Sequence, residues 1–132
     1  MVVLPYNREA TKDMKPLRWI GGSRQDVTDF PKDVRREIGF ALDAAQNGEK
    51  HPSAKPLQGF GGAGVLEVVE DHFGDTYRAV YTVKFAEAVY VPHTFKKKSK
   101  SGIKTPKQEI DLIKSRLIRA KEDYDLWEKT KK

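Results

Sequence analysis

The chain has 132 residues, no cysteine, 38% apolar residues and a formal charge of +6 at pH 7, which suits one compact domain over residues 1–132 with an arm of uncertain structure at 1–16. The lack of cysteine excludes thiol catalysis, disulfide frameworks and cysteine-based zinc sites. No apolar run reaches the roughly 20 residues that span a bilayer and no signal-peptide pattern begins the chain, so we expect a cytoplasmic protein that makes no membrane contact.

The first two elements follow the arm. Residues 17–20 form a short apolar run that Gly21 and Gly22 stop, and this pattern predicts a strand. Residues 31–47 show helical periodicity, with Pro31 suited to the first turn and Gly48 to the position after the last. The apolar positions of this predicted helix fall on one face and are Val34, Ile38, Ala41, Leu42 and Ala45.

Three strands are predicted after a loop rich in glycine and proline. The loop covers residues 49–64, and the strands cover residues 65–70, 76–85 and 88–95. The connections between the strands are short enough for antiparallel hairpins. The second strand has the clearest alternation, with one face formed by Tyr77, Ala79, Tyr81, Val83 and Phe85.

A long helix closes the chain. Thr105 can cap it, Pro106 suits its first turn and Gln108 would complete a capping box. Spacings of three and four residues produce an apolar stripe of Ile110, Ile113, Leu117, Ala120, Tyr124 and Trp127. Packing of this stripe on the sheet is favoured over a groove for a partner. The whole pattern predicts an α+β fold, with a small antiparallel sheet packed by an N-terminal helix and a long C-terminal helix.

The positive charge is concentrated at the C-terminal end. Residues 1–92 carry 12 basic and 13 acidic side chains, whereas residues 93–132 carry 13 basic and 6 acidic ones. A concentrated basic segment favours a polyanion such as nucleic acid or the ribosome, or an acidic protein. The alternative is a solvated tail.

The hairpin between the last two predicted strands places basic groups together. A loop of even length near residues 86–87 fixes a register in which Arg78, His93 and Lys97 share one face. The expected pairs are Arg78 with Phe95, Val80 with His93, and Thr76 with Lys97. A loop of odd length would set His93 on the apolar face beside Tyr81, and Pro92 could introduce a bulge. The favoured register predicts a cationic cluster at the surface that contains one imidazole.

Such a cluster suits cleavage of RNA by its own 2′-hydroxyl. A guanidinium at Arg78 can bind the phosphate as it gains negative charge, and His93 titrates in the range needed for proton transfer. The adjoining lysines 96–98 could hold the backbone. The competing interpretation is a packed histidine beside a solvated strand end.

Other chemistry is disfavoured by spacing. His51, His72 and His93 are far apart and lie beside no acidic pair of metal-ligand spacing, so we expect no metal site and no cofactor. The glycine-rich residues 59–64 lack the Gly-Lys-Ser/Thr ending of a phosphate loop. A close approach to the sheet is the favoured use of these glycines.

Four segments resemble the RelE/ParE superfamily of toxins, in its HigB-like, phage-associated branch. They are Lys-Pro-Leu-Gln-Gly at 55–59, Leu-Glu at 66–67, Thr-Tyr-Arg-Ala-Val-Tyr at 76–81 and His-Thr-Phe-Lys-Lys-Lys-Ser at 93–99. The resemblance runs from about residue 31 to residue 119. It implies a small toxin that enters the ribosomal A site, cuts mRNA without metal and leaves a 2′,3′-cyclic phosphate. It also implies a cognate helix-turn-helix antitoxin.

The resemblance assigns roles to individual residues. Arg78 matches the strand arginine at the scissile phosphate, Lys97 or Lys98 matches the basic pair after the third strand, and His93 matches the histidine of this branch. Together they give Arg78, His93 and Lys97 as candidate catalytic residues. The candidate substrate-binding residues are Lys55, Lys96, Lys98 and Lys100.

The chain also departs from the family pattern. Val69 stands where many relatives carry arginine, Pro92 replaces an aliphatic residue, and Tyr124 is better explained as core than as a base-stacking tyrosine. Two alternatives to cleavage therefore stay open. One is a ParE-like inhibitor of DNA gyrase that cuts nothing, and the other is an inactive relative that binds RNA or protein.

Overall fold

The computed structural model describes residues 14–62, 64–98 and 105–131. Its elements are β1 (Leu17–Trp19), α1 (Ser23–Thr28), α2 (Lys32–Gln46), β2 (Ala54–Pro56), β3 (Val65–His72), β4 (Asp75–Thr82), β5 (Val89–Lys98) and α3 (Lys107–Thr130). The α+β class is confirmed. Two short elements, α1 and β2, carry too few residues for a periodic signal and were not predicted.

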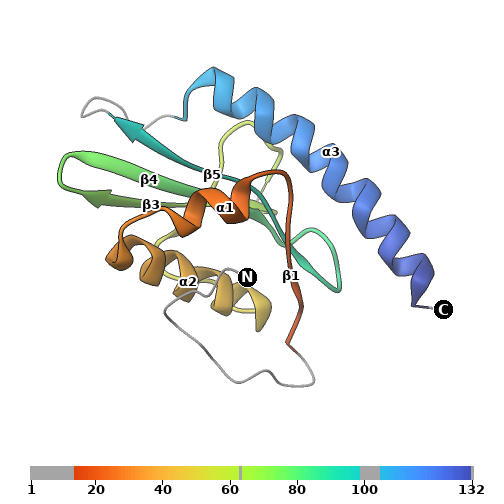
Figure 1. Cartoon of the computed structure of the whole chain (residues 1–132). Coiled ribbons are helices and arrows are strands. Elements are labelled where there is room, and N and C mark those ends of the chain that lie inside the picture. The colour runs from red at the N-terminus through yellow and green to blue at the C-terminus, as the bar shows by residue number, and fades with distance from the viewer. Residues whose placement is uncertain (1–13, 63, 99–104, 132) are drawn as a thin grey trace.

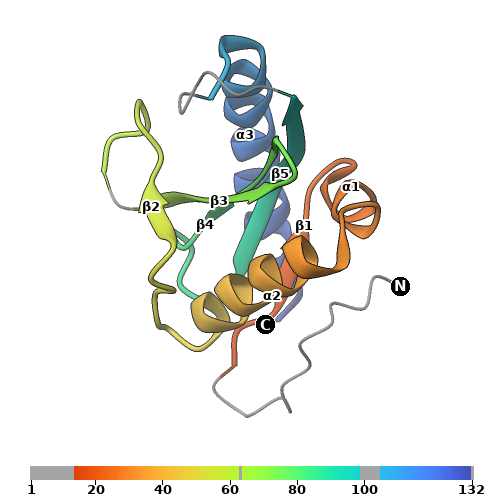
Figure 2. The ribbon, with the colours of Figure 1, turned by 90° about the vertical axis from the view of Figure 1, so that its left-hand side faces the viewer.

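One five-stranded sheet runs through the middle of the molecule in the order β1-β5-β4-β3-β2. Its strands pair in antiparallel fashion except β1, which lies parallel to β5. The sheet is therefore mixed rather than wholly antiparallel. Figures 1 and 2 show α2 on one face of the sheet and α3 across the other.

The face under α2 holds the main apolar core. The predicted stripe of α2 is buried at every position, from Val34 to Ala45. It packs on the alternating face of β4, formed by Tyr77, Ala79 and Tyr81. The apolar faces predicted from helix periodicity in α2 and from alternation in β4 therefore pack against each other.

The face under α3 is held by two smaller apolar clusters. Ile113 is fully buried and packs with Leu57, Val65 and Val80. Nearer the C-terminus, Ala120 is fully buried and packs in a cluster that also contains Ile20, Phe85, Ala88, Tyr90, Tyr124 and Trp127. Packing of the α3 stripe on the sheet is therefore confirmed, and so is the place of Tyr124 in the core. No helix in the described ranges is long and apolar enough to cross a membrane.

The predicted register between β4 and β5 is confirmed from Thr76 to Val80. Arg78 pairs with Phe95, Val80 with His93 and Thr76 with Lys97. The ladder then shifts by one residue, because Thr82 pairs with Tyr90. Val91 and Pro92 thus stand opposite Tyr81 alone, so the bulge lies at the proline. The ladder ends at Thr82, earlier than the predicted strand end at residue 85.

The predicted start of the long helix is wrong in one respect. Pro106, with φ −60° and ψ 151°, is the N-cap of α3, and no side chain caps the helix. The Thr105 hydroxyl therefore forms no capping box with Gln108. It bonds to groups on the sheet instead, as described below.

Candidate functional site

Four of the predicted site residues lie on one face of the sheet. Lys55 pairs with Glu67, Glu67 with Val80, and Val80 with His93, so this row crosses β2, β3, β4 and β5. Arg78 and Lys97 follow on the same face two and four residues along their strands. This is the face that α3 covers in part (Figure 1).

Arg78 lies inside the protein. Its side chain is only 1% exposed, and its Nη1 lies 3.6 Å from Glu67 Oε1. Nη1 also donates a hydrogen bond of 3.1 Å to Thr105 Oγ1, and the Thr105 hydroxyl donates one of 3.0 Å to Glu67 Oε2. A buried guanidinium is stable when its charge is matched in this way. The predicted surface exposure of Arg78 is therefore wrong, although its face is right.

His93 is also buried, with 5% of the residue exposed. Its Nε2 lies 2.6 Å from Glu109 Oε1, and its Nδ1 lies 3.0 Å from Arg116 Nη1. A guanidinium only donates, so Nδ1 is the acceptor and the ring proton sits on Nε2, where Glu109 accepts it. Burial lowers the pKa of His93, with Arg116 acting in the same direction and Glu109 opposing them.

Arg116 reaches this position because Gly21 leaves room for it. Gly21 has φ +59°, and a Cβ there would lie 2.8 Å from the guanidinium carbon of Arg116. The glycine therefore serves both the left-handed backbone and the close approach. Arg116 also donates a hydrogen bond of 3.1 Å to the Pro92 carbonyl at the bulge.

The predicted lysines are divided between the two faces. Lys97 is half-buried on the face of Arg78, and Lys55 is exposed there. Lys96 points to the other face, where its Nζ lies 3.2 Å from Asp75 Oδ2 and 5.8 Å from the Tyr77 ring centre. The bond to Asp75 raises the pKa of Lys96. Lys96 therefore lies on the opposite face of the sheet from Arg78.

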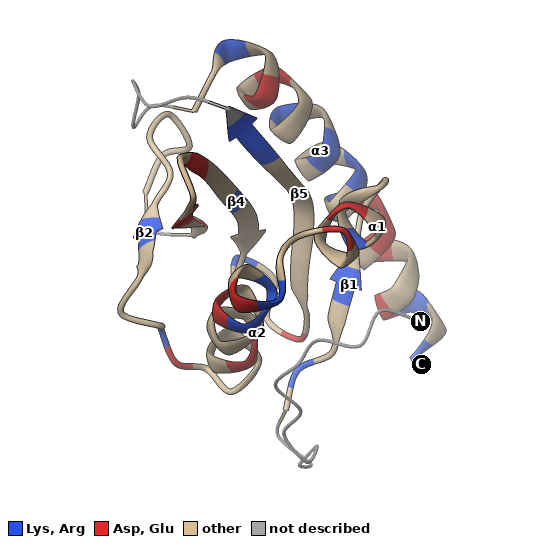
Figure 3. Cartoon of the chain, turned by 60° about the vertical axis from the view of Figure 1, so that its left-hand side comes forward, with Lys and Arg blue, Asp and Glu red and all other residues tan. Residues whose placement is uncertain are grey.

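The remaining predicted lysines are Lys98 and Lys100. The backbone of Lys98 pairs with Asp75 at the end of β5, and Lys100 lies outside the described residues. Figure 3 shows this end of β5 as a basic segment close to the start of α3.

Four polar residues of the site were missed by the sequence reasoning: Glu67, Thr105, Glu109 and Arg116. A signal existed for Glu67, since a two-residue turn at Phe73-Gly74 fixes the β3–β4 register and sets Glu67 beside Arg78. No local signal existed for the other three. Their contacts depend on the direction in which α3 crosses the sheet.

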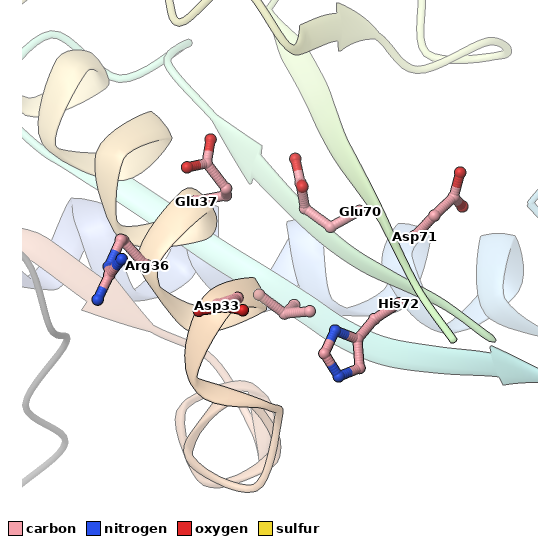
Figure 4. Close-up of a pocket in the computed structure, with 7 residues that line it drawn as sticks. Asp33, Arg36, Glu37, Glu70, Asp71 and His72 are labelled. Carbon is pink, nitrogen blue, oxygen red and sulfur yellow. The ribbon is translucent and has the colours of Figure 1, made fainter. Parts of the chain in front are cut away.

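Two surface hollows lie near these elements, and both are acidic. The first, of about 370 Å³, lies between α2 and the end of β3 and is lined by Asp33, Val34, Arg36, Glu37, Glu70, Asp71 and His72. Figure 4 shows Glu37 and Glu70 on its two sides. Burial, followed by the charges of Glu37 and Asp71, raises the pKa of Glu70. This hollow would repel a phosphate.

The second hollow, of about 460 Å³, opens beside His93 and Glu109. Asp26, Asp29 and Lys96 also line it. With Glu109 its carboxylates outnumber its one lysine, so it too is poorly suited to a polyanion. Within the part of the chain that the structure describes, no group of three or more His, Asp or Glu residues could hold a metal ion. The described groups best suited to phosphate are therefore those of the Arg78 face.

A comparison with known protein families found a match that covers this site. A family model described as "Phage derived protein Gp49-like (DUF891)" matches residues 25–118, which is more than half of the chain. The match includes Arg78, His93, Lys97 and the partners that bury them. No curated protein and no solved structure gives a significant match.

Proposed function

Because the chain belongs to the Gp49-like family of phage-derived proteins, a RelE/ParE-like toxin family of toxin–antitoxin systems, we propose that it is the toxin of a type II module and cuts mRNA on the ribosome. The run of His-x-Phe-x-Lys-Lys at 93–98 favours the HigB-like branch of these toxins. The proposed reaction needs no metal, because the 2′-hydroxyl of the RNA attacks the adjacent phosphate.

One observation carries this proposal: Arg78, His93 and Lys97 lie on one face in the register of β4 and β5. In the proposed reaction the guanidinium of Arg78 binds the scissile phosphate, since its planar fork matches two phosphate oxygens. Lys97 and the exposed Lys55 hold the backbone on either side. The products are a 2′,3′-cyclic phosphate and a 5′-hydroxyl end.

The proposed part of His93 is limited by its bonds. Its Nδ1 lone pair accepts from Arg116 and its Nε2 proton is donated to Glu109. A general base needs a free lone pair within reach of the proton it removes. His93 would thus serve as a base only after Arg116 withdraws. Lys97, on the same face of the sheet, is the alternative candidate for proton transfer.

The proposed partners are the ribosome with its mRNA and a helix-turn-helix antitoxin. Expression of the chain alone should arrest growth, and the protein encoded beside it should restore growth. If the neighbouring protein does not restore growth, its assignment as the antitoxin is wrong.

A second candidate function is inhibition of DNA gyrase without any cleavage. The burial of Arg78 and His93 favours it, because only 1% of Arg78 and 5% of His93 are exposed. The two functions differ in products that can be measured directly. Purified protein added to translating ribosomes should yield fragments with 5′-hydroxyl ends, and supercoiling by gyrase should be unaffected. Intact message with inhibited gyrase would reverse the assignment.

The same assay tests the role of the Arg78 face. Lys97→Ala should lower the cleavage rate by about 100- to 1000-fold, in the range of a lost transition-state contact. Lys129→Ala is the matched control, because Lys129 is an exposed lysine on α3 far along the chain from the site. Equal rates for the two variants would remove Lys97 from the mechanism.

A further inference from the structure

Thr105, just before α3, and Glu109, in its first turn, lie against the two buried groups of the proposed site. Thr105 accepts from Arg78 and donates to Glu67, with distances of 3.1 and 3.0 Å. Four residues later, Glu109 accepts from His93 at 2.6 Å. One short segment thus occupies the groups on Arg78 and His93 that would otherwise face a substrate.

This segment is attached differently from the rest of α3. Its bonds to Arg78, Glu67 and His93 are polar, and Thr105 and Glu109 both keep partial contact with solvent. The helix beyond is anchored by the buried Ile113 and Ala120 and their apolar neighbours. Bonds to water can replace these polar contacts once the segment opens, whereas apolar burial has no such substitute.

The hydroxyl of Thr105 does not cap the first turn of α3. A threonine before a helix commonly caps the free amides of the first turn, but α3 has no side-chain cap. The start of the helix therefore depends on the sheet contacts and on the partly buried Ile110, which packs beside Ile113. A segment of this kind can open locally while the remaining helix stays in place.

We infer that residues 105–109 form a closing segment that shields Arg78 and His93 in the free protein and moves away when RNA binds. This inference rests on the proposed function. The negative charges of Glu67 and Glu109 hold the guanidinium of Arg78 and the Nε2 proton of His93 in the closed state, and the RNA phosphates compete for the same groups. Opening exposes Arg78 and frees His93 from Glu109 in one movement.

Each substitution removes or weakens a contact to one of the two buried residues, and the test measures the accessibility of the other one. Thr105→Val removes the bonds to Arg78 and Glu67, and Glu109→Gln weakens the bond to His93. In the full-length protein, diethyl pyrocarbonate measures the accessibility of His93 in Thr105→Val, and phenylglyoxal measures that of Arg78 in Glu109→Gln. The labelling rate should rise by roughly fivefold or more over wild type in Thr105→Val, which loses two hydrogen bonds, and by a smaller factor in Glu109→Gln, in which one bond is weakened.

Three controls accompany these variants. Glu122→Gln makes the same chemical change at an exposed glutamate of the same helix and should label as wild type does. Thr105→Ser keeps the hydroxyl and should restore protection of His93. Circular dichroism shows whether each variant is folded, so that labelling of an unfolded chain is not counted.

The outcomes separate the inference from the proposed function. Unchanged labelling of His93 in folded Thr105→Val would show that the segment does not move as a unit, and would overturn the inference. If the labelling rises and the wild-type protein cuts no message on ribosomes, the closing segment exists but the proposed function fails. If the wild type cuts and the folded variants with faster labelling cut no faster, the segment does not control the site.

Discussion

His93 shows how two neighbours fix the protonation of one side chain. Arg116 can only donate, so it selects the tautomer in which Nδ1 accepts and Nε2 donates to Glu109. The ring also stacks on Phe95 with centroids 4.9 Å apart. The charged groups that face it are Glu109, Arg116 and, from α1, Asp26, and burial outweighs the two carboxylates in lowering its pKa.

This environment predicts how stability depends on pH. Folding lowers the pKa of His93 from its ordinary value near 6.5, so the unfolded chain binds the proton more readily. The stabilising contribution is complete above about pH 6.5 and is lost as the pH falls below that value. Urea denaturation between about pH 7 and 5 should show a steeper loss for wild type than for His93→Gln, which keeps an acceptor and a donor. Parallel curves would contradict the shift.

The pair of Arg78 and Glu67 predicts a non-additive response to substitution. Arg78→Gln alone leaves the charge of Glu67 without its partner in a site where that side chain is only 14% exposed. The single change should cost about 3–5 kcal/mol, and the double change with Glu67→Gln should cost clearly less. Urea denaturation of the four proteins of this cycle measures the coupling. A loss in the double variant equal to the sum of the two single losses would show that the pair is not coupled.

At the scale of elements, the β3–β4 hairpin contains a backbone conformation that its sequence does not favour. Phe73 has φ +48° and Gly74 has φ +87°, as a two-residue turn between the paired His72 and Asp75 requires. The Phe73 residue is 95% exposed and its ring contacts His72, with centroids 4.5 Å apart, so burial does not offset the strain. Asparagine and glycine are the residues that adopt this conformation most readily.

Phe73→Asn should therefore stabilise the protein, by about 1 kcal/mol. Ile118→Asn is a useful contrast, because it also replaces an exposed apolar residue, with 64% exposure, but in a helix where asparagine is unfavourable. Urea denaturation midpoints should move in opposite directions for the two variants. A loss of stability in Phe73→Asn would show that the contact of the Phe73 ring with His72 outweighs the backbone strain.

At the scale of the whole molecule, the two faces of the sheet have different chemistry. The α2 face is an apolar core with an acidic hollow at its edge, whereas the α3 face holds charged groups in its interior. The basic excess of residues 93–132 follows β5 and α3. A polyanion is therefore expected to approach from the side of the α3 face.

This distribution predicts a strong salt dependence for binding to ribosomes. Each phosphate contact releases counterions, so six or more contacts would lower affinity by about a thousandfold or more between roughly 50 and 200 mM salt. Cosedimentation of the purified protein with ribosomes over this range measures the slope. A flat response would indicate a protein surface as the binding partner.

The sequence by itself determined the elements whose signal is local. Alternation in β4 and helical spacing in α2 and α3 identify buried faces, because side chains repeat with periods of two and 3.6 residues. The same alternation placed Arg78, His93 and Lys97 on one face, since the expected cross-strand pairs hold despite the bulge at Pro92. The fold class follows from the order of these elements.

Only the tertiary structure decided that Arg78 and His93 are buried and that α3 begins over them. Arginine is rarely buried without a partner, and its partners here are 11 and 27 residues away along the chain. Likewise, the parallel pairing of β1 with β5 joins segments far apart in sequence. Residue type sets what each group can bond to, but the crossing of a helix over a sheet sets which groups meet, and that crossing is fixed by packing of the whole core.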